Sequence, residues 1–513
     1  MGGPIQFKAN LRLFEAITII VGSMIGSGIL LLPADMAEMM PSPGLILIVF
    51  VTGAVLTVVG ALTFAEMSAM FPRAGGQYHF LKEGMGRAYG YMFGWTQFWV
   101  IQTGIVAGVA VAVTRFTKFF VERNGGHLGG HTVQLTDLVD VGPCVQESLA
   151  GECTKRLIHL DPFTIPAWGD AFVAIAAILV LMGLNMLSTR FGGIVQNVST
   201  VAKVLGLASL VAIIFIGGSM VDHAYEAQGG GFAPEGMGAG ALVVAFGGAL
   251  ALSLFAYDGW PQATYVAGEV RNAKRNLPLA LIIGPLITAA VYIALTAAYF
   301  YVIPTDEAVQ LGLNDERIAP VAAGKVWEYG PVFISGVALV SVFGTVNGFL
   351  LTAPRIFYAL SHDGALLPSM GKISDRNTPA WAIYFTALWA SLLVLSGGYQ
   401  QLVTMVVFGI FVFYVPTAIA HMRMRRTHKH IERPFKTPLF PLVPILFLLA
   451  STFIVGIILV GSLLQGLIAL VLILLGVPFY FLQRPRMLRV EAERAGESST
   501  KVHGDDQADI DVA

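Results

Sequence analysis

The sequence predicts an all-α membrane protein with twelve transmembrane helices, and its composition supplies three reasons. Of the 513 residues, 56% are hydrophobic and 12% are charged, whereas an average soluble domain is about 25% charged. The mean hydropathy of +0.72 is too high for a surface that faces water. Glycine is abundant, with 57 residues, and membrane helices contain more glycine than soluble helices do. A soluble multidomain protein is therefore excluded.

The same counts exclude two further classes of protein. Two cysteines are too few for a disulfide scaffold. A net charge of -1 offers no basic surface for nucleic acid. The apolar runs are continuous and do not alternate at every second residue, which favours helices over the strands of a membrane barrel.

Twelve apolar segments are each long enough for the roughly 20 residues that cross the hydrocarbon core. No short apolar stretch with a cleavage site precedes the first of them, so we expect an uncleaved first helix. The expected spans are 11–37, 44–70, 90–120, 165–187, 194–217, 239–267, 278–302, 330–361, 379–396, 399–422, 440–461 and 463–482.

Lysine and arginine are concentrated in alternate loops, for example at Arg423, Arg425 and Arg426 after the tenth span. Because basic loops stay in the cytoplasm, we expect both termini there and the protein in the plasma or inner membrane. The segment 304–329 is expected outside, as a cap with a short helix or two. The expected organisation is a cytoplasmic N-terminus (1–10), a first five-helix repeat (11–217) with a long outside loop (about 121–168), a second repeat (218–422), helices 11 and 12 (423–482) and a disordered tail (483–513).

Two spans contain residues that interrupt a helix. The first span holds three glycines and two serines between Gly22 and Gly28, and each glycine costs about 1 kcal/mol relative to alanine in a helix. The sixth span combines Asp258 with Gly259 and Pro261. Interrupted helices at matching positions of two halves indicate a transporter site at the membrane midplane, within an inverted five-plus-five repeat. The alternative is that the small residues only allow close helix packing.

Several blocks of sequence, in order, carry a family resemblance. They are GSMIGSGI (22–29), FAEMSAMFPRAGGQYHFLKEGMG (64–86), QNVSTVAK (196–203), LFAYDGW (254–260), RNLPLA (275–280), GTVNGFLLTAPRIFYALSHDGALLP (344–368) and RPFKTPLFPLVP (433–444). Together they resemble the amino acid–polyamine–organocation (APC) transporter superfamily, and most of all its L-type amino acid transporter branch with the bacterial relatives of that branch. The resemblance implies ten core helices in an inverted repeat and two peripheral helices.

A free amino acid presents a carboxylate and an ammonium group, and the two breaks offer partners for both. Gly26, Ser27 and Gly28 begin the helical segment after the first break, where N–H donors and the positive end of the helix dipole would bind the carboxylate. The resemblance implies that the carbonyls of Met24 and Phe255 accept from the ammonium. It also implies that Phe255 is the aromatic gate over the substrate, with an ordinary packing role as the alternative.

Two charged residues fall near the middle of predicted spans. Asp258 is expected to pair with the substrate ammonium or with a cationic side chain, unless it merely caps the broken helix. The resemblance implies that Lys203 occupies the place of sodium in related sodium-coupled carriers and bridges the first and eighth helices; the alternatives are a proton-coupling role and a lysine that reaches the membrane surface.

Other polar residues leave two roles open. Asn347 in span eight, like Gln102 and Thr103 in span three, is expected either to line the substrate pocket or to hydrogen-bond between helices. Glu66 and Glu269 are expected to be solvated loop charges, or ion pairs with nearby Arg73 and Arg271.

Cys144 and Cys153 both fall in the long outside loop, where a disulfide between them is expected. Animal members of the resembled family use one cysteine of this loop to attach a single-pass glycoprotein, and the pair of cysteines favours the internal bridge over such a heavy-chain subunit. The histidines at 421, 428 and 430 lack metal-ligand spacing, so neither a metal nor a cofactor is expected. The expected partners are amino acid substrates and membrane lipid.

The function predicted is secondary active transport of amino acids by alternating access, as sodium-independent exchange of neutral or cationic L-amino acids. Proton-coupled uptake of amino acids or polyamines is the first alternative, and a non-transporting nutrient sensor is an alternative of another class. No channel filter and no nucleotide-binding loop is present in the sequence, and an enzyme is not expected.

Overall fold

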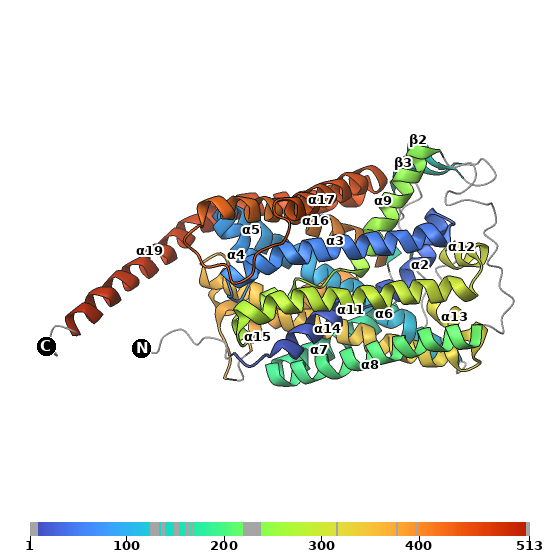
Figure 1. Ribbon diagram of the computed structural model, residues 1–513, viewed down its shortest axis with the longest axis horizontal. Helices are drawn as coiled ribbons and strands as arrows, with labels where there is room; N and C mark the ends of the chain where they lie inside the picture. The colour runs from blue at the N-terminus through green and yellow to red at the C-terminus, as the bar shows by residue number, and fades with distance from the viewer. Residues whose placement is uncertain are drawn as a thin grey trace.

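The structure, a computed structural model, describes residues 9–123, 133–134, 139–147, 153–160, 164–165, 168–218, 238–313, 317–375, 378–395 and 399–508. Its long helices lie side by side along the longest axis of the molecule (Figure 1). Helices α12 and α13 and the strands β2 and β3 gather at one end of this bundle, and α4, α5 and α19 lie toward the other.

The helices match the predicted spans closely. The longer ones are α3 (Pro43–Met70), α6 (Gln102–Arg123), α7 (Trp168–Leu187), α8 (Thr189–Gly217), α9 (Ala239–Ala256), α11 (Ala273–Val302), α14 (Gly330–His362), α15 (Ala380–Val394), α16 (Tyr399–Thr427), α17 (Leu442–Gly461), α18 (Leu463–Leu474) and α19 (Gly476–Ala508). The shorter ones are α1 (Leu13–Met24), α2 (Gly28–Met39), α4 (Gln77–Met85), α5 (Arg87–Thr96), α10 (Gln262–Tyr265), α12 (Thr305–Leu313), α13 (Ile318–Val326), and the 3-10 helices η3 (Ala267–Glu269) and η4 (Pro368–Gly371).

Within the described residues, 10 helical segments are long and apolar enough to cross a membrane. The predicted spans 165–187 and 379–396 correspond to two shorter apolar helices, Ala171–Leu187 and Ala380–Val394. The prediction of a helical, multi-pass membrane protein is therefore confirmed.

Local sequence explains where several helices begin. Ser42 accepts a hydrogen bond from the backbone N–H of Leu45, and Pro43 occupies the first turn of α3, where its missing N–H costs nothing. Ser188 caps α8 in the same way by accepting from the N–H of Arg190. Such caps satisfy the N–H groups that the first turn of a helix leaves without partners.

The predicted third span is interrupted by a turn that the sequence did not indicate. A π-helical turn, η1 (Gln97–Ile101), separates α5 from α6. Turns of this kind insert a wider loop of backbone into a helix and occur frequently at functional sites.

The two long segments that are predicted to lie outside differ in structure. The segment 304–329 contains two short helices, α12 and α13, as expected. In the long loop, β2 (Val139–Glu147) pairs antiparallel with β3 (Cys153–Leu160), and β1 (Val133–Gln134) with β4 (Thr164–Ile165). Cys144 and Cys153 lie on the paired strands β2 and β3, but their side chains fall outside the described part, so the disulfide remains a prediction.

The tail corrects one expectation. The segment after Gln483 was expected to be disordered, whereas α19 continues as a helix from Gly476 to Ala508. Alanine, glutamate and arginine in its EAERAGE stretch are strong helix formers, which offsets the shortage of apolar residues there.

The core of the bundle forms around the interrupted helices. Helix α11 packs along α3 and α1, and α14 packs against α8 and α6. The buried apolar side chains of these helices form one large continuous cluster. Both helix breaks lie inside this cluster and therefore away from lipid, as unwound backbone at membrane depth requires.

Candidate functional site

Both predicted helix breaks are present, and they touch each other. The first lies between α1 and α2 at residues 25–27, and the second lies between α9 and α10 at residues 257–261. Gly259 has a φ of +111°, and a Cβ built on it would lie 2.7 Å from the carbonyl carbon of Ser23. Only glycine fits there, because it tolerates this φ and lets the second break reach the backbone of the first.

The start of α2 lies beside the end of α9. A Cβ on Gly28 would lie 2.8 Å from Cβ and 2.9 Å from Cα of Ala256. Gly26, Ser27 and Gly28 are all buried, and Ser27 is the N-cap of α2. The first N–H groups of α2 lack partners within the helix and carry the positive end of its dipole, so this end of α2 suits a carboxylate.

The carbonyls expected to bind the ammonium already have partners. The hydroxyl of Tyr292 on α11 lies 2.7 Å from the carbonyl oxygen of Met24 and 3.0 Å from that of Ala256. The carbonyl of Phe255 accepts from the N–H of Asp258 at 3.0 Å. Because a carbonyl has two lone pairs, each oxygen retains capacity for one further donor.

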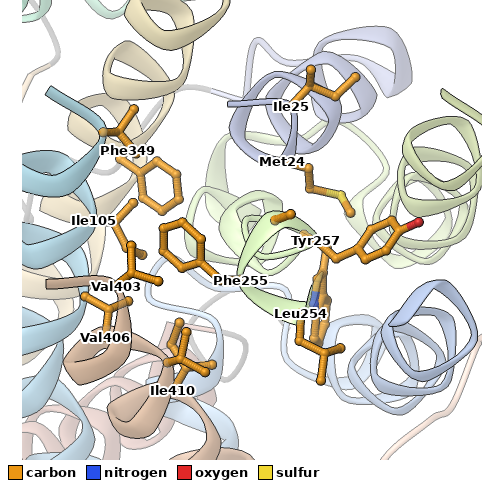
Figure 2. Packing of buried hydrophobic residues seen from close by; sticks show 14 of the residues in the cluster. Met24, Ile25, Ile105, Leu254, Phe255, Tyr257, Phe349, Val403, Val406 and Ile410 are labelled. Carbon is orange, nitrogen blue, oxygen red and sulfur yellow. The ribbon is translucent and has the colours of Figure 1, made fainter. Parts of the chain in front are cut away.

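Phe255, the predicted gate, is buried with 8% of its surface exposed. Figure 2 shows its ring directed toward Ile105, Phe349 and Val403 and away from Met24 and Tyr257. In this conformation the ring packs between α6, α14 and α16.

Lys203 is fully buried on α8 and links the first break to α14. Its Nζ donates to the carbonyls of Gly22 at 2.9 Å, Ile25 at 2.7 Å and Ser341 at 2.8 Å. The hydroxyl oxygen of Thr345 lies 3.1 Å away. The lysine therefore does not reach the membrane surface. Its ammonium lies at the C-terminal end of α1, where the helix dipole is negative.

Asp258 lines a pocket beside the second break. The other polar walls of this pocket come from Gln77, Gln97, Gln102, Gln262, Tyr265 and Tyr414. The Tyr414 hydroxyl donates to Oδ1 of Asp258 over a long 3.4 Å. The carboxylate thus remains available to a ligand in the pocket.

Asn347 takes the second of its two predicted roles. Its side chain accepts from Asn185 at 2.9 Å and donates to the Gly192 carbonyl at 3.0 Å and to Gln196 at 2.9 Å. These contacts tie α14 to α7 and α8. A part of Asn347 in substrate binding remains a prediction.

Glu66 and Glu269 are buried ion pairs, and the expectation of solvated charges was wrong. Glu66 contacts Arg425 at 2.5 Å, His421 at 3.1 Å and Arg433 at 3.3 Å. The expected partners Arg73 and Arg271 lie near in sequence, but the actual partners come from segments that are distant in the chain.

Glu269 pairs with the buried Arg355 of α14 at 2.8 Å. The backbone N–H of Leu11, at the start of the chain's first helical region, donates to the Glu269 carbonyl at 2.9 Å.

Among the described residues no cluster of three or more His, Cys, Asp or Glu side chains could hold a metal ion.

Three residues near the breaks were not singled out from the sequence: Gln97, Tyr292 and Tyr414. Each reaches the site from a helix distant in sequence, so only the three-dimensional packing identifies it. Gln102, which was singled out, does line the pocket with Asp258.

These features are typical of one class of protein: multi-pass membrane transporters with a candidate site between two interrupted helices. The family model for amino acid permeases matches residues 11–478, and the chain belongs to that family. It is accordingly a transporter and not an enzyme.

Named relatives cover nearly the whole chain. It is 33% identical to the b(0,+)-type amino acid transporter 1 of Mus musculus, over 93% of this chain and 88% of the relative. It is 28% identical to the serine/threonine exchanger SteT of Bacillus subtilis, over 93% of this chain and 98% of that relative. It is also 28% identical to the large neutral amino acids transporter small subunit 2 of Rattus norvegicus, over 94% of this chain and 82% of that relative.

Proposed function

We propose that the protein exchanges neutral and cationic L-amino acids across the cell membrane by alternating access, without sodium. The observation that carries the proposal is the contact between the two helix breaks, with a lysine ammonium bound to the first of them. Relatives named as a serine/threonine exchanger and as amino acid transporters support amino acids as the substrate class and exchange as the mode.

The two charged groups of the substrate are assigned to the two breaks. The carboxylate binds at the N-terminus of α2, at Gly26, Ser27 and Gly28, where N–H donors and the helix dipole act together. The ammonium binds at the carbonyls of Met24 and Phe255. Phe255 closes over the bound substrate, which requires its ring to leave the packing position of Figure 2.

Lys203 supports independence from sodium. Its ammonium fills a position surrounded by three carbonyls and one hydroxyl, and oxygen ligands of this kind are those that a sodium ion needs. A fixed cation there holds the first break against α14 without a metal ion.

Asp258 extends the range of substrates to cationic side chains. Its carboxylate lies in a pocket inside the helix bundle, where its attraction for an ammonium or guanidinium group is stronger than in water. A neutral amino acid forms no ion pair with Asp258 and is transported as well.

The finer topology is part of the proposal. The chain has twelve spans, with an inverted repeat of helices 1–5 and 6–10, and both termini are cytoplasmic. The gathering of β2, β3, α12 and α13 at one end of the bundle supports this orientation (Figure 1). No linked heavy-chain subunit is needed if Cys144 and Cys153 pair with each other across β2 and β3.

A counterflow experiment tests the function. Purified protein in liposomes is preloaded with unlabelled leucine, serine or arginine, and uptake of the same labelled amino acid is measured in sodium chloride and in choline chloride. We expect uptake only into preloaded liposomes and equal rates in the two salts.

Three outcomes contradict the proposal. A requirement for sodium contradicts the role of Lys203. Uptake into empty liposomes driven by an inward pH gradient favours proton coupling over exchange. Binding of amino acids without any uptake indicates a sensor.

A further inference from the structure

The pocket beside Asp258 has two polar walls to which the proposed function assigns no part in substrate recognition. Gln97 and Gln102 belong to the third transmembrane segment, and both side chains line this pocket together with Asp258. Both are almost fully buried, with 2% and 1% of their surface exposed. A polar side chain in such a position requires a partner.

The π-helical turn is what brings the two glutamines to one face. In a continuous α-helix, residues five apart point about 140° away from each other. Here the N–H of Gln102 donates to the carbonyl of Gln97, and this five-residue spacing is the π-helical hydrogen bond that stacks the two residues one turn apart. The π-helical turn therefore places both glutamines at the pocket.

The unsatisfied groups of the pocket are hydrogen-bond acceptors. Within the described part of the chain, the side-chain oxygens of Gln97 and Gln102 have no hydrogen-bond partner. The neighbouring glutamines differ, since Oε1 of Gln262 accepts from Thr352 at 2.5 Å and Nε2 of Gln77 donates to Thr417 at 2.9 Å. Gln97 and Gln102, whose side-chain oxygens lack a partner, thus line the same pocket as the Asp258 carboxylate.

The chemistry of the missing partner follows from this set of acceptors. A neutral apolar side chain would leave both amide oxygens unpaired, which is unfavourable in a buried site. An ammonium or guanidinium group carries three to five N–H donors and a positive charge, so it satisfies the two oxygens and neutralises Asp258. Charge-assisted hydrogen bonds of this kind are the stronger ones.

We propose that Gln97 and Gln102 are specificity-determining residues that complete, with Asp258, a subsite for the cationic side chain of lysine-like or arginine-like substrates. The inference rests on the proposed transport of amino acids and adds the residues that select among them. Asp258 supplies the negative charge, and the two amide oxygens fix the orientation of the cationic group.

The test compares arginine with leucine in the proteoliposome assay. The variants are Gln97→Leu and Gln102→Leu, with Asp258→Asn as a reference for loss of the charge. For each variant, kcat/KM is measured for both substrates. We expect the arginine-to-leucine ratio to fall roughly tenfold or more in each, the loss of one or more good hydrogen bonds to a charged group.

Two further variants separate recognition from folding. Gln97→Glu keeps an acceptor oxygen in place, and we expect it to retain the preference for arginine that Gln97→Leu loses. Gln465→Leu makes the same change at a buried glutamine of α18 away from the pocket, and its ratio should equal that of the wild type. Size-exclusion profiles identify any variant that fails to fold.

An unchanged arginine-to-leucine ratio in both leucine variants would overturn the proposal, because the glutamines would then only pack. A wild-type protein that carries leucine but not arginine overturns this inference and leaves amino acid transport intact. A wild-type protein that carries neither overturns both.

Discussion

Lys203 is the residue whose surroundings say most about how this protein works. A buried charge normally requires a charged partner or a full set of hydrogen bonds. Lys203 has oxygens from two different elements instead: Gly22 and Ile25 at the end of α1, and Ser341 and Thr345 on α14. The charge thus joins the unwound part of the first span to a helix that stays continuous.

Removal of this ammonium should disrupt both stability and transport. In Lys203→Met the three carbonyls lose the ammonium as a donor. The Ser341 hydroxyl still reaches the Ile25 carbonyl, and the one proton of the Thr345 hydroxyl is left for the other two, so one buried acceptor is left unpaired, at a cost of about 1–3 kcal/mol. We expect a lower melting temperature in detergent and loss of counterflow. Thermal unfolding and leucine counterflow measure the two effects.

The matched control is Lys274→Met, which removes an exposed lysine paired with Glu432. Surface ion pairs contribute at most about 1 kcal/mol, so this variant should resemble the wild type. Exchange at the wild-type rate by Lys203→Met would show that the bridge between α1 and α14 has no part in transport.

At the scale of elements, the close approach of the two breaks depends on small residues. Gly259 touches the backbone of Ser23, and Gly28 touches Ala256. The Tyr292 hydroxyl then holds the carbonyls of Met24 and Ala256 from a third helix. The four helices α1, α2, α9 and α10 are therefore positioned as one unit around the site.

Addition of a single methyl group at Gly28 should push α2 away from α9. The Cβ of Gly28→Ala would lie 2.8 Å from Cβ and 2.9 Å from Cα of Ala256, so α2 must shift away from α9. Misplacement of this order can reduce activity about 100-fold, and we expect a loss of counterflow of at least about tenfold. The measurement is the initial rate of leucine exchange.

Gly336→Ala on α14 is the control, because a Cβ there meets nothing within 4 Å. It should fold and exchange like the wild type, with a small gain in helix stability. If Gly28→Ala matched this control, the contact between α2 and α9 would not be needed for transport.

The breaks could be predicted from the sequence because their causes are local. Glycine, serine and proline weaken a helix wherever they cluster, and Asp258 marks its own position within an apolar run. The π-helical turn at Gln97–Ile101 has no such signal, since QFWVI suits an ordinary helix equally well. The partners of Glu66 and Glu269 were missed because a buried carboxylate is paired by packing and not by proximity in sequence.

At the scale of the whole molecule, ion pairs join segments that are far apart in the chain at one end of the bundle. Glu269 pairs with Arg355, and Lys82 of α4 pairs with Asp363, just after α14, at 2.6 Å. The Tyr78 hydroxyl donates to the same Asp363 carboxylate at 2.7 Å. Although burial alone would raise the pKa of Asp363, Lys82 and these hydrogen bonds hold it below its ordinary value, which favours the charged carboxylate.

His79, beside this group, should make the stability of the whole protein depend on pH. Burial lowers the pKa of His79 from 6.5 to about 4, and the charges of Lys82 and Arg73 add to the effect against the opposing charge of Asp363. Between these two pH values the unfolded chain binds a proton at this position that the folded protein does not. Acidification across this range therefore favours unfolding, by about 1–3 kcal/mol.

We expect the melting temperature in detergent to fall as the pH is lowered from 6.5 to 4, and His79→Gln to reduce that fall. Glutamine keeps a donor for the Ala74 carbonyl, which His79 Nε2 contacts at 2.9 Å, but it has no proton to gain. The same substitution at the exposed His430 serves as the control. The prediction is contradicted if the melting temperatures of wild type and His79→Gln depend equally on pH. His79 would then be protonated as readily in the folded protein as in the unfolded chain. In that case the buried arrangement of α4 against the end of α14 would not hold in solution.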